Sequence, residues 1–96
     1  MTTPTIEQIN RHSSIRSYRP DAVPKSSVEA IVAAGQRAST SSNMQFTTAV
    51  AVTDPAKRER LAELCGNQAH IRQAPVFIAW CVDRARLDTA CQMRGY

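Results

Sequence analysis

The first apolar positions of the chain are sparse and have a helical spacing. Ile6 and Ile9 lie three residues apart, and Thr3-Pro4 before them pairs a helix-capping residue with a proline in the first turn. We therefore expect a short helix over about residues 4–11. The stretch that follows, RHSSIRSY, suits neither a strand core nor a helix face, and RPDAVPK after it holds two prolines. Residues 19–25 are predicted to form an irregular connection.

The next apolar pattern is more regular. Its members recur at i, i+3, i+4 and i+7, and they are Val28, Ile31, Val32 and Gly35. This spacing predicts a helix over about residues 26–38 with one apolar stripe. Ser26 and Glu29 have the spacing of a capping box at its start. The small residues AAG near its end would let another element pack closely there.

Two later stretches have the character of strands. FTTAVAVT, residues 46–53, is rich in β-branched residues. VFIAWCV, residues 76–82, is apolar without alternation, which is typical of a strand covered on both faces. Four hydroxyl residues and an amide in ASTSSNMQ, residues 38–45, predict a loop before the first strand.

The segment between the two strands should be helical. Asp54-Pro55 is a cap for a helix over about residues 55–65, and Gly66-Asn67 would end it. A second short helix over residues 68–73 is expected before Pro75. After the second strand, RARLDTACQMRG is expected to begin either a helix or an irregular segment.

Helices that alternate with two strands predict an α+β fold, with helices packed on a sheet. Two strands make a very small sheet, however, and no closing element follows RGY. We therefore expect residues 1–96 to be one portion of a single domain. The rest of the fold would either be missing or come from another chain.

Charge narrows the classes of partner only slightly. The net charge is +4 and the isoelectric point is about 9.4, which suits anionic ligands. The Lys and Arg residues are scattered and aromatics make up only 5%, too few for base-stacking platforms, so a nucleic-acid partner is not expected. The longest uncharged apolar stretch, APVFIAWCV, is far shorter than the ~18 residues that would span a membrane.

Cysteine and histidine usage points to a reducing compartment. The three cysteines form no CxxC pair and leave an odd count, and the N-terminus lacks the order of a signal peptide. We expect a cytoplasmic protein with reduced, structural thiols. The two histidines have no Cys or carboxylate at ligand spacing, so no metal site is expected.

RHSSIRSY, residues 11–18, has two readings. Two arginines, a histidine and three serines in eight residues provide forked N–H donors and compact hydroxyls, which suit an anion such as phosphate. The same residues would also make an ordinary solvated basic loop. These residues alone do not decide between the two.

Four stretches together resemble one family. TIEQINRHSSIRSY, AGQRASTSSNMQ, VTDPAKRERLAELCGNQAHI and APVFIAWCVD match, in order and spacing, the N-terminal part of FMN-dependent nitroreductases. The branch they resemble most is that of the oxygen-insensitive NADPH nitroreductases and flavin reductases. The resemblance implies the first two fifths or so of a mixed α/β sandwich that forms a homodimer, with FMN at the dimer interface.

The resemblance assigns RHSSIR to the FMN phosphate and ribityl chain. The family's usual motif is His-Arg-Ser-x-Arg, and here it reads His12, Ser13, Ser14, Ile15 and Arg16. Arg16 would pair with the phosphate as a charge-assisted fork, and His12, Ser13 and Ser14 would add hydrogen bonds. Ser13 replaces the usual arginine, which removes one cation and implies weaker or differently balanced phosphate binding. The alternative for Arg16 is a surface ion pair with Asp21.

Two further segments would approach the flavin. Thr40, Ser41 and Asn43 belong to the family's serine-rich loop, although the same residues would make a helix end and turn in any case. Gln68 matches a glutamine that hydrogen-bonds the ribityl chain or ring edge, or is simply a polar residue at a helix end. His70 would line the substrate or nicotinamide side, or lie on the surface.

The implied activity is two-electron transfer from NADPH or NADH, through FMN, to a nitroaromatic, a quinone or free flavin in a ping-pong cycle. The flavin supplies the chemistry, so no residue is named as a catalytic nucleophile. The alternative is a non-catalytic fragment or small interaction module that does not retain FMN by itself.

Overall fold

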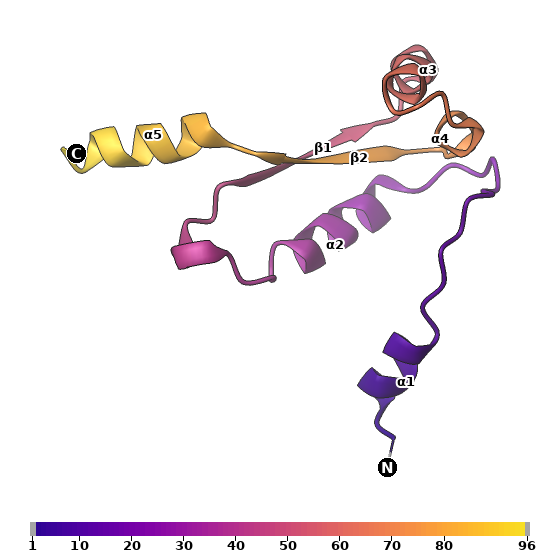
Figure 1. Ribbon diagram of the computed structural model, residues 1–96, viewed down its shortest axis with the longest axis horizontal. Coiled ribbons are helices and arrows are strands. Elements are labelled where there is room, and N and C mark those ends of the chain that lie inside the picture. The colour runs from indigo at the N-terminus through magenta and orange to yellow at the C-terminus, as the bar shows by residue number, and fades with distance from the viewer. Residues whose placement is uncertain (1, 96) are drawn as a thin grey trace.

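The computed structural model describes residues 2–95, and its elements follow the predicted order. The chain runs through α1 (Pro4–Asn10), α2 (Lys25–Gly35), the 3-10 turn η1 (Ser41–Asn43), β1 (Thr47–Val52), α3 (Pro55–Leu64), α4 (Ala69–Gln73), β2 (Phe77–Val82) and α5 (Arg84–Met93) (Figure 1). The stretch after the second strand is a helix, which decides between the two structures expected there.

Two of the three predicted helix caps are confirmed. Thr3 accepts a hydrogen bond from the backbone N–H of Ile6 at 3.3 Å, and Asp54 accepts one from Ala56 at 2.9 Å. Gly66 and Asn67 adopt positive φ angles of 85° and 58°, as the end of α3 requires.

The predicted capping box is wrong. Helix α2 begins one residue earlier than expected, at Lys25, and Pro24 occupies the cap position without any side-chain cap bond. The Pro24 carbonyl accepts from Ser27 and Val28 at 3.0 and 3.2 Å. Because proline already has a φ of −57°, the first turn forms directly on it and Ser26 falls inside the helix. The helix also ends at Gly35, three residues before the predicted end.

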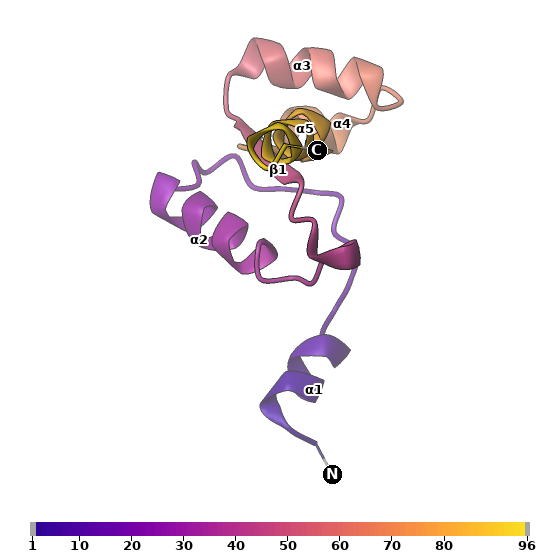
Figure 2. The ribbon, with the colours of Figure 1, turned by 90° about the vertical axis from the view of Figure 1, so that its left-hand side faces the viewer.

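The two strands pair antiparallel, from Thr47 opposite Val82 to Val52 opposite Phe77. Helices α3 and α4 lie in the connection between them. Figures 1 and 2 show α2 and α3 on opposite sides of this two-stranded ribbon, while α5 continues beyond the end of β2. The antiparallel pairing matters for the site, because it brings the start of β1 next to the residues that lead into α5.

The chain buries very little by itself. Among residues 2–95 only Ala62, on α3, is fully buried. The radius of gyration is 17.0 Å, whereas a compact domain of this length would have about 12.5 Å. Its surface of 8026 Å² likewise exceeds the roughly 5,500 Å² of a compact protein of this mass.

The second strand illustrates the same openness. Trp80 is 47% exposed and Val82 is 74% exposed, so residues 2–95 do not cover both faces of the strand as its apolar run predicted. Within the same residues, no helix is long and apolar enough to cross a membrane.

Candidate functional site

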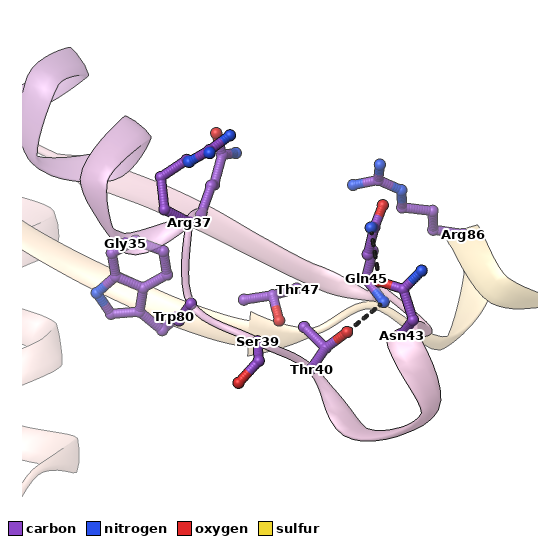
Figure 3. A pocket seen from close by; sticks show the side chains of 11 residues that line it. Gly35, Arg37, Ser39, Thr40, Asn43, Gln45, Thr47, Trp80 and Arg86 are labelled. Atoms are coloured by element: carbon purple, nitrogen blue, oxygen red, sulfur yellow. Dashed lines mark hydrogen bonds between the residues drawn. The ribbon is translucent and has the colours of Figure 1, made fainter.

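A cavity of about 630 Å³ opens where α2 ends and the serine-rich loop begins. Figure 3 shows Arg37 and Thr40 entering from this loop, Trp80 from β2 and Arg86 from α5. Its lining combines two guanidinium groups, hydroxyls, amides and one indole ring. A cavity of this size and mixed chemistry falls in the range that accommodates small organic ligands.

The serine-rich loop has a strained backbone that its own polar groups hold in place. Ser42, Asn43 and Gln45 all have positive φ angles between 51° and 54°, which non-glycine residues adopt rarely. The Thr40 hydroxyl accepts a hydrogen bond from the Gln45 N–H at 3.1 Å, and the Gln45 amide donates to Asn43 at 2.9 Å. Because the Thr40 oxygen is used as an acceptor, its O–H remains available to donate to a ligand.

Two of the three residues predicted in this loop line the cavity. Thr40, which is half-buried, and Asn43 are among its walls, as Figure 3 shows. Ser41 begins η1 between them and does not line the cavity. The loop also makes the turn that the alternative interpretation required, so the same backbone serves both interpretations.

The close approach expected at the end of α2 is present. A Cβ atom on Gly35 would lie 2.6 Å from Cη2 of Trp80, so the indole packs directly on the glycine. This contact places the ring against the wall of the cavity. The AAG stretch was the signal in the sequence that another element would pack there.

Arg86 also reaches the cavity, and no feature of the sequence singled it out. Asp83 caps α5 by accepting from the Arg86 N–H at 3.0 Å and also accepts from the Thr48 hydroxyl at 2.5 Å. The Thr48 hydrogen bond, followed by that from the Arg86 N–H, lowers the pKa of Asp83 below its ordinary value. Asp83 thereby attaches the start of α5, and Arg86 with it, to β1.

The phosphate-binding residues expected in RHSSIR lie elsewhere. His12, Ser13, Ser14 and Arg16 are exposed in an irregular segment and line neither this cavity nor a second one described below. Figure 1 shows this segment leading into the start of α2, whereas the serine-rich loop follows its end. Residues 2–95 therefore do not bring the RHSSIR residues and the serine-rich loop together.

Arg16 does not make the surface ion pair offered as its alternative. Asp21 pairs instead with Arg19, at 2.7 Å. Within the described part of the chain, Arg16 has no carboxylate partner. Its segment is folded back by Tyr18, whose hydroxyl donates to the Ile15 carbonyl at 2.7 Å.

Gln68 is the residue before α4, and His70 lies in the first turn of that helix. The Gln68 amide donates to the Cys65 carbonyl at 2.7 Å, the contact expected of a polar residue at a helix end. His70 is half-buried, and its ring lies 6.3 Å from that of Tyr18 at an angle of 56°. Both rings line a second, largely apolar cavity of about 810 Å³. Among residues 2–95, no three His, Cys, Asp or Glu side chains gather as metal ligands would.

Comparison with known proteins identifies the family. A model of the nitroreductase family matches residues 9–79. The chain is 40% identical over 85 residues to an NADPH-flavin oxidoreductase of Vibrio harveyi, covering 88% of this chain and 35% of that protein. It is 41% identical over 89 residues to an oxygen-insensitive NADPH nitroreductase of Salmonella typhimurium, covering 93% of this chain and 37% of that one.

Solved structures agree in fold. NfrA2 of B. megaterium superposes with a TM-score of 0.91 at 37% identity, over 98% of this chain and 38% of that one. The NADPH:FMN oxidoreductase of Vibrio harveyi, complexed with NAD+, gives 0.81 at 40% identity, over 90% and 37%. The chain thus spans little more than a third of the length of these relatives. It folds as the matching part of their α+β domain does, and it belongs to the nitroreductase family.

Proposed function

We propose that this chain is part of an FMN-dependent oxidoreductase that takes electrons from NADPH or NADH. The observation that carries the proposal is the 40% identity, across most of the chain, to the Vibrio harveyi NADPH-flavin oxidoreductase. When bound, FMN would supply the redox chemistry, accepting a hydride from the nicotinamide and passing two electrons to a second substrate in a ping-pong cycle. The acceptor we propose is a nitroaromatic, a quinone or free flavin.

The donor set of the chain fits FMN. Arg16 is exposed without a carboxylate partner among the described residues, so its guanidinium is available to a phosphate. His12, Ser13 and Ser14 add short donors beside it. Ser13 stands where the family usually has arginine, so the phosphate would be held by fewer cations than in most relatives.

The roles of the remaining site residues follow from their positions. Thr40 and Asn43 would donate to the polar part of the flavin from the wall of the first cavity, and Ser41 would join them from the same turn. Gln68 would reach the ribityl chain or ring edge from the start of α4. His70 would face the nicotinamide or the acceptor. These residues bind and orient, and none is proposed as a nucleophile.

The separation of these groups supports a homodimer. The RHSSIR segment and the serine-rich loop are at different ends of α2, so one copy of residues 2–95 does not present both to one ligand. A flavin between two subunits would receive the phosphate site from one copy and the serine-rich loop from the other. We propose such an arrangement for a domain of which residues 1–96 are the N-terminal portion, acting in the cytoplasm.

The test is an absorbance spectrum of the purified chain before and after FMN is added and excess FMN is removed by gel filtration. A retained visible flavin band that bleaches on addition of NADPH supports the proposal. A retained band that NADPH does not bleach would leave flavin binding intact but exclude electron transfer by this chain.

A second candidate is a non-catalytic interaction module. Its supporting observation is that Ala62 alone is buried among residues 2–95, which leaves large apolar surfaces free for another protein. Absence of any retained flavin in the same experiment favours this candidate.

A further inference from the structure

Several polar contacts hold the turn that precedes α4 and carries Gln68. It begins at Gly66 and Asn67, whose φ angles of 85° and 58° are left-handed. The Asn67 N–H donates to the carbonyl of Ala62 at 2.7 Å, which anchors the turn to the one fully buried residue of the described chain. Left-handed backbone at a non-glycine residue persists only where its surroundings hold it.

Arg72 supplies the principal side-chain restraint. Its Nε donates to Glu59 of α3 at 2.7 Å, and its Nη2 donates to the side-chain oxygen of Asn67. One guanidinium therefore joins α3 to the turn through donors held in a fixed plane, a geometry that the compact ammonium of lysine does not reproduce. The Arg72 side chain is 30% exposed, whereas the side chain of Arg19, which forms a surface ion pair, is 89% exposed. Solvent therefore screens the contacts of Arg72 less.

Arg58 of α3 holds the C-terminal end of α4, the helix that contains Arg72. Its Nη1 donates to the carbonyls of Arg72, at 3.3 Å, and of Ala74, which lie at the C-terminal end of α4 where carbonyls lack helical partners. Its Nε donates to the Thr53 carbonyl, at the end of β1, at 3.3 Å. Helix α4 is thus attached at one end through Arg58 and at the other through Arg72.

We propose that Arg72 is a positioning residue for the flavin-binding turn. By holding Asn67, it sets the direction in which Gln68 leaves the turn and in which His70 leaves the first residues of α4. This inference rests on the proposed function, because Gln68 and His70 matter as ligands only if FMN binds. The structural part of it, that Arg72 orders residues 66–70, stands independently.

The ordering is tested by amide hydrogen exchange on the ligand-free chain. Arg72→Met keeps a flexible apolar side chain and removes both contacts, and Arg72→Lys keeps a cation without the fork. The matched control is Arg60→Met, which removes the exposed ion pair between Arg60 and Glu63, 2.8 Å long, on α3. Helix α3 also carries Glu59, the partner of Arg72. We expect exchange at residues 66–70 to accelerate about tenfold in Arg72→Met, and less in Arg72→Lys, with β1 and β2 unchanged.

Exchange at residues 66–70 that stays as slow as in wild type would overturn the inference. Acceleration that is equal in the strands would also overturn it, because it would show a general loss of stability. Arg60→Met should leave exchange at these residues unchanged, and an effect as large as that of Arg72→Met would again contradict a specific restraint.

A double-mutant cycle links the restraint to the ligand. If Arg72 acts through Gln68, then Arg72→Met and Gln68→Ala should weaken FMN binding non-additively, with a coupling of about 3- to 10-fold in Kd. Additive effects would contradict positioning of Gln68. An unchanged Kd in Gln68→Ala would instead rule out the proposed role of Gln68. If the wild-type chain does not bind FMN, the proposed function is wrong. In both cases the hydrogen-exchange result still decides whether Arg72 orders the turn.

Discussion

At the scale of single residues, Arg16 has the clearest proposed role. It is exposed, and within the described chain the neighbouring Asp21 is taken by Arg19. The N–H donors of the Arg16 guanidinium are therefore available to a ligand. Charge-assisted hydrogen bonds to a phosphate are stronger than neutral ones. Removal of the Arg16 side chain should therefore mainly lower the affinity for a phosphate-containing ligand.

We predict that Arg16→Ala raises the Kd for FMN about 10- to 100-fold, because hydrogen bonds to charged groups contribute roughly 1.5–3 kcal/mol. Flavin fluorescence titration measures it. The matched control is Arg19→Ala, which removes the same charge three residues away and should change Kd by less than about threefold. Equal effects of the two substitutions would mean that only the local net charge matters.

Asp83 provides a prediction about pH. Its pKa is lowered in the folded chain by the Thr48 and Arg86 hydrogen bonds, so the folded state favours its ionised form. The resulting stabilisation is fully present above the unfolded pKa, about 3.9, and is lost as the pH falls through the lower folded pKa.

Asp83→Asn does not titrate, and its single side-chain oxygen can still accept the capping hydrogen bond from the Arg86 N–H. We therefore predict that the free energy of unfolding of this variant falls less steeply than that of wild type on acidification below about pH 4. Asp21→Asn, in an exposed ion pair, serves as control. Parallel pH curves for wild type and Asp83→Asn would show that the capping carboxylate does not contribute.

At the scale of elements, local patterns predicted most of what the structure contains. The helix caps at Thr3 and Asp54 and the two strands depend on neighbouring residues, and they appear where the pattern placed them. The Ser26 capping box failed because a competing local rule, the preset φ of Pro24, acted one residue earlier.

The cavity was not predictable in the same way. Arg86 and Trp80 reach it only because β1 and β2 pair antiparallel, a contact between residues 25 to 35 positions apart along the chain. Single-sequence patterns have no information on that pairing. The family resemblance named Thr40 and Asn43 because it carries tertiary information from relatives, yet the positions of their neighbours in the cavity came from the structure.

The contact between α2 and β2 gives the prediction for this scale. In Gly35→Ala the new Cβ would lie 2.6 Å from the Trp80 ring, so the indole must move outward. Overpacking costs about 1–3 kcal/mol and the gain in helix propensity returns about 1 kcal/mol, so we expect a net loss of about 1 kcal/mol. Trp80 is the single tryptophan of the chain, and its emission should shift to longer wavelength.

Thr5→Ala, on the separate helix α1, is the control for this substitution and should leave the emission unchanged. A more stable Gly35→Ala variant with wild-type fluorescence would show that the ring does not pack on Gly35.

At the scale of the whole molecule, the chain behaves as part of a larger fold. Its shape is open, with a radius of gyration of 17.0 Å. Its backbone superposes closely on a little over a third of each solved relative. Eleven large apolar side chains of residues 2–95 are exposed, among them Ile31, Trp80 and Val82. With one fully buried residue among residues 2–95, these side chains have almost no core of their own to enter. We infer that the flavin site is completed by surfaces outside one copy of residues 2–95.

The most direct test of the central claim compares FMN with riboflavin, which is FMN without its phosphate. Both are titrated into the purified chain at equilibrium and followed by flavin fluorescence. We expect saturable FMN binding that is at least about tenfold tighter than riboflavin binding, because RHSSIRSY would bind the phosphate. Equal affinity for the two, or no saturable binding of FMN, would contradict it.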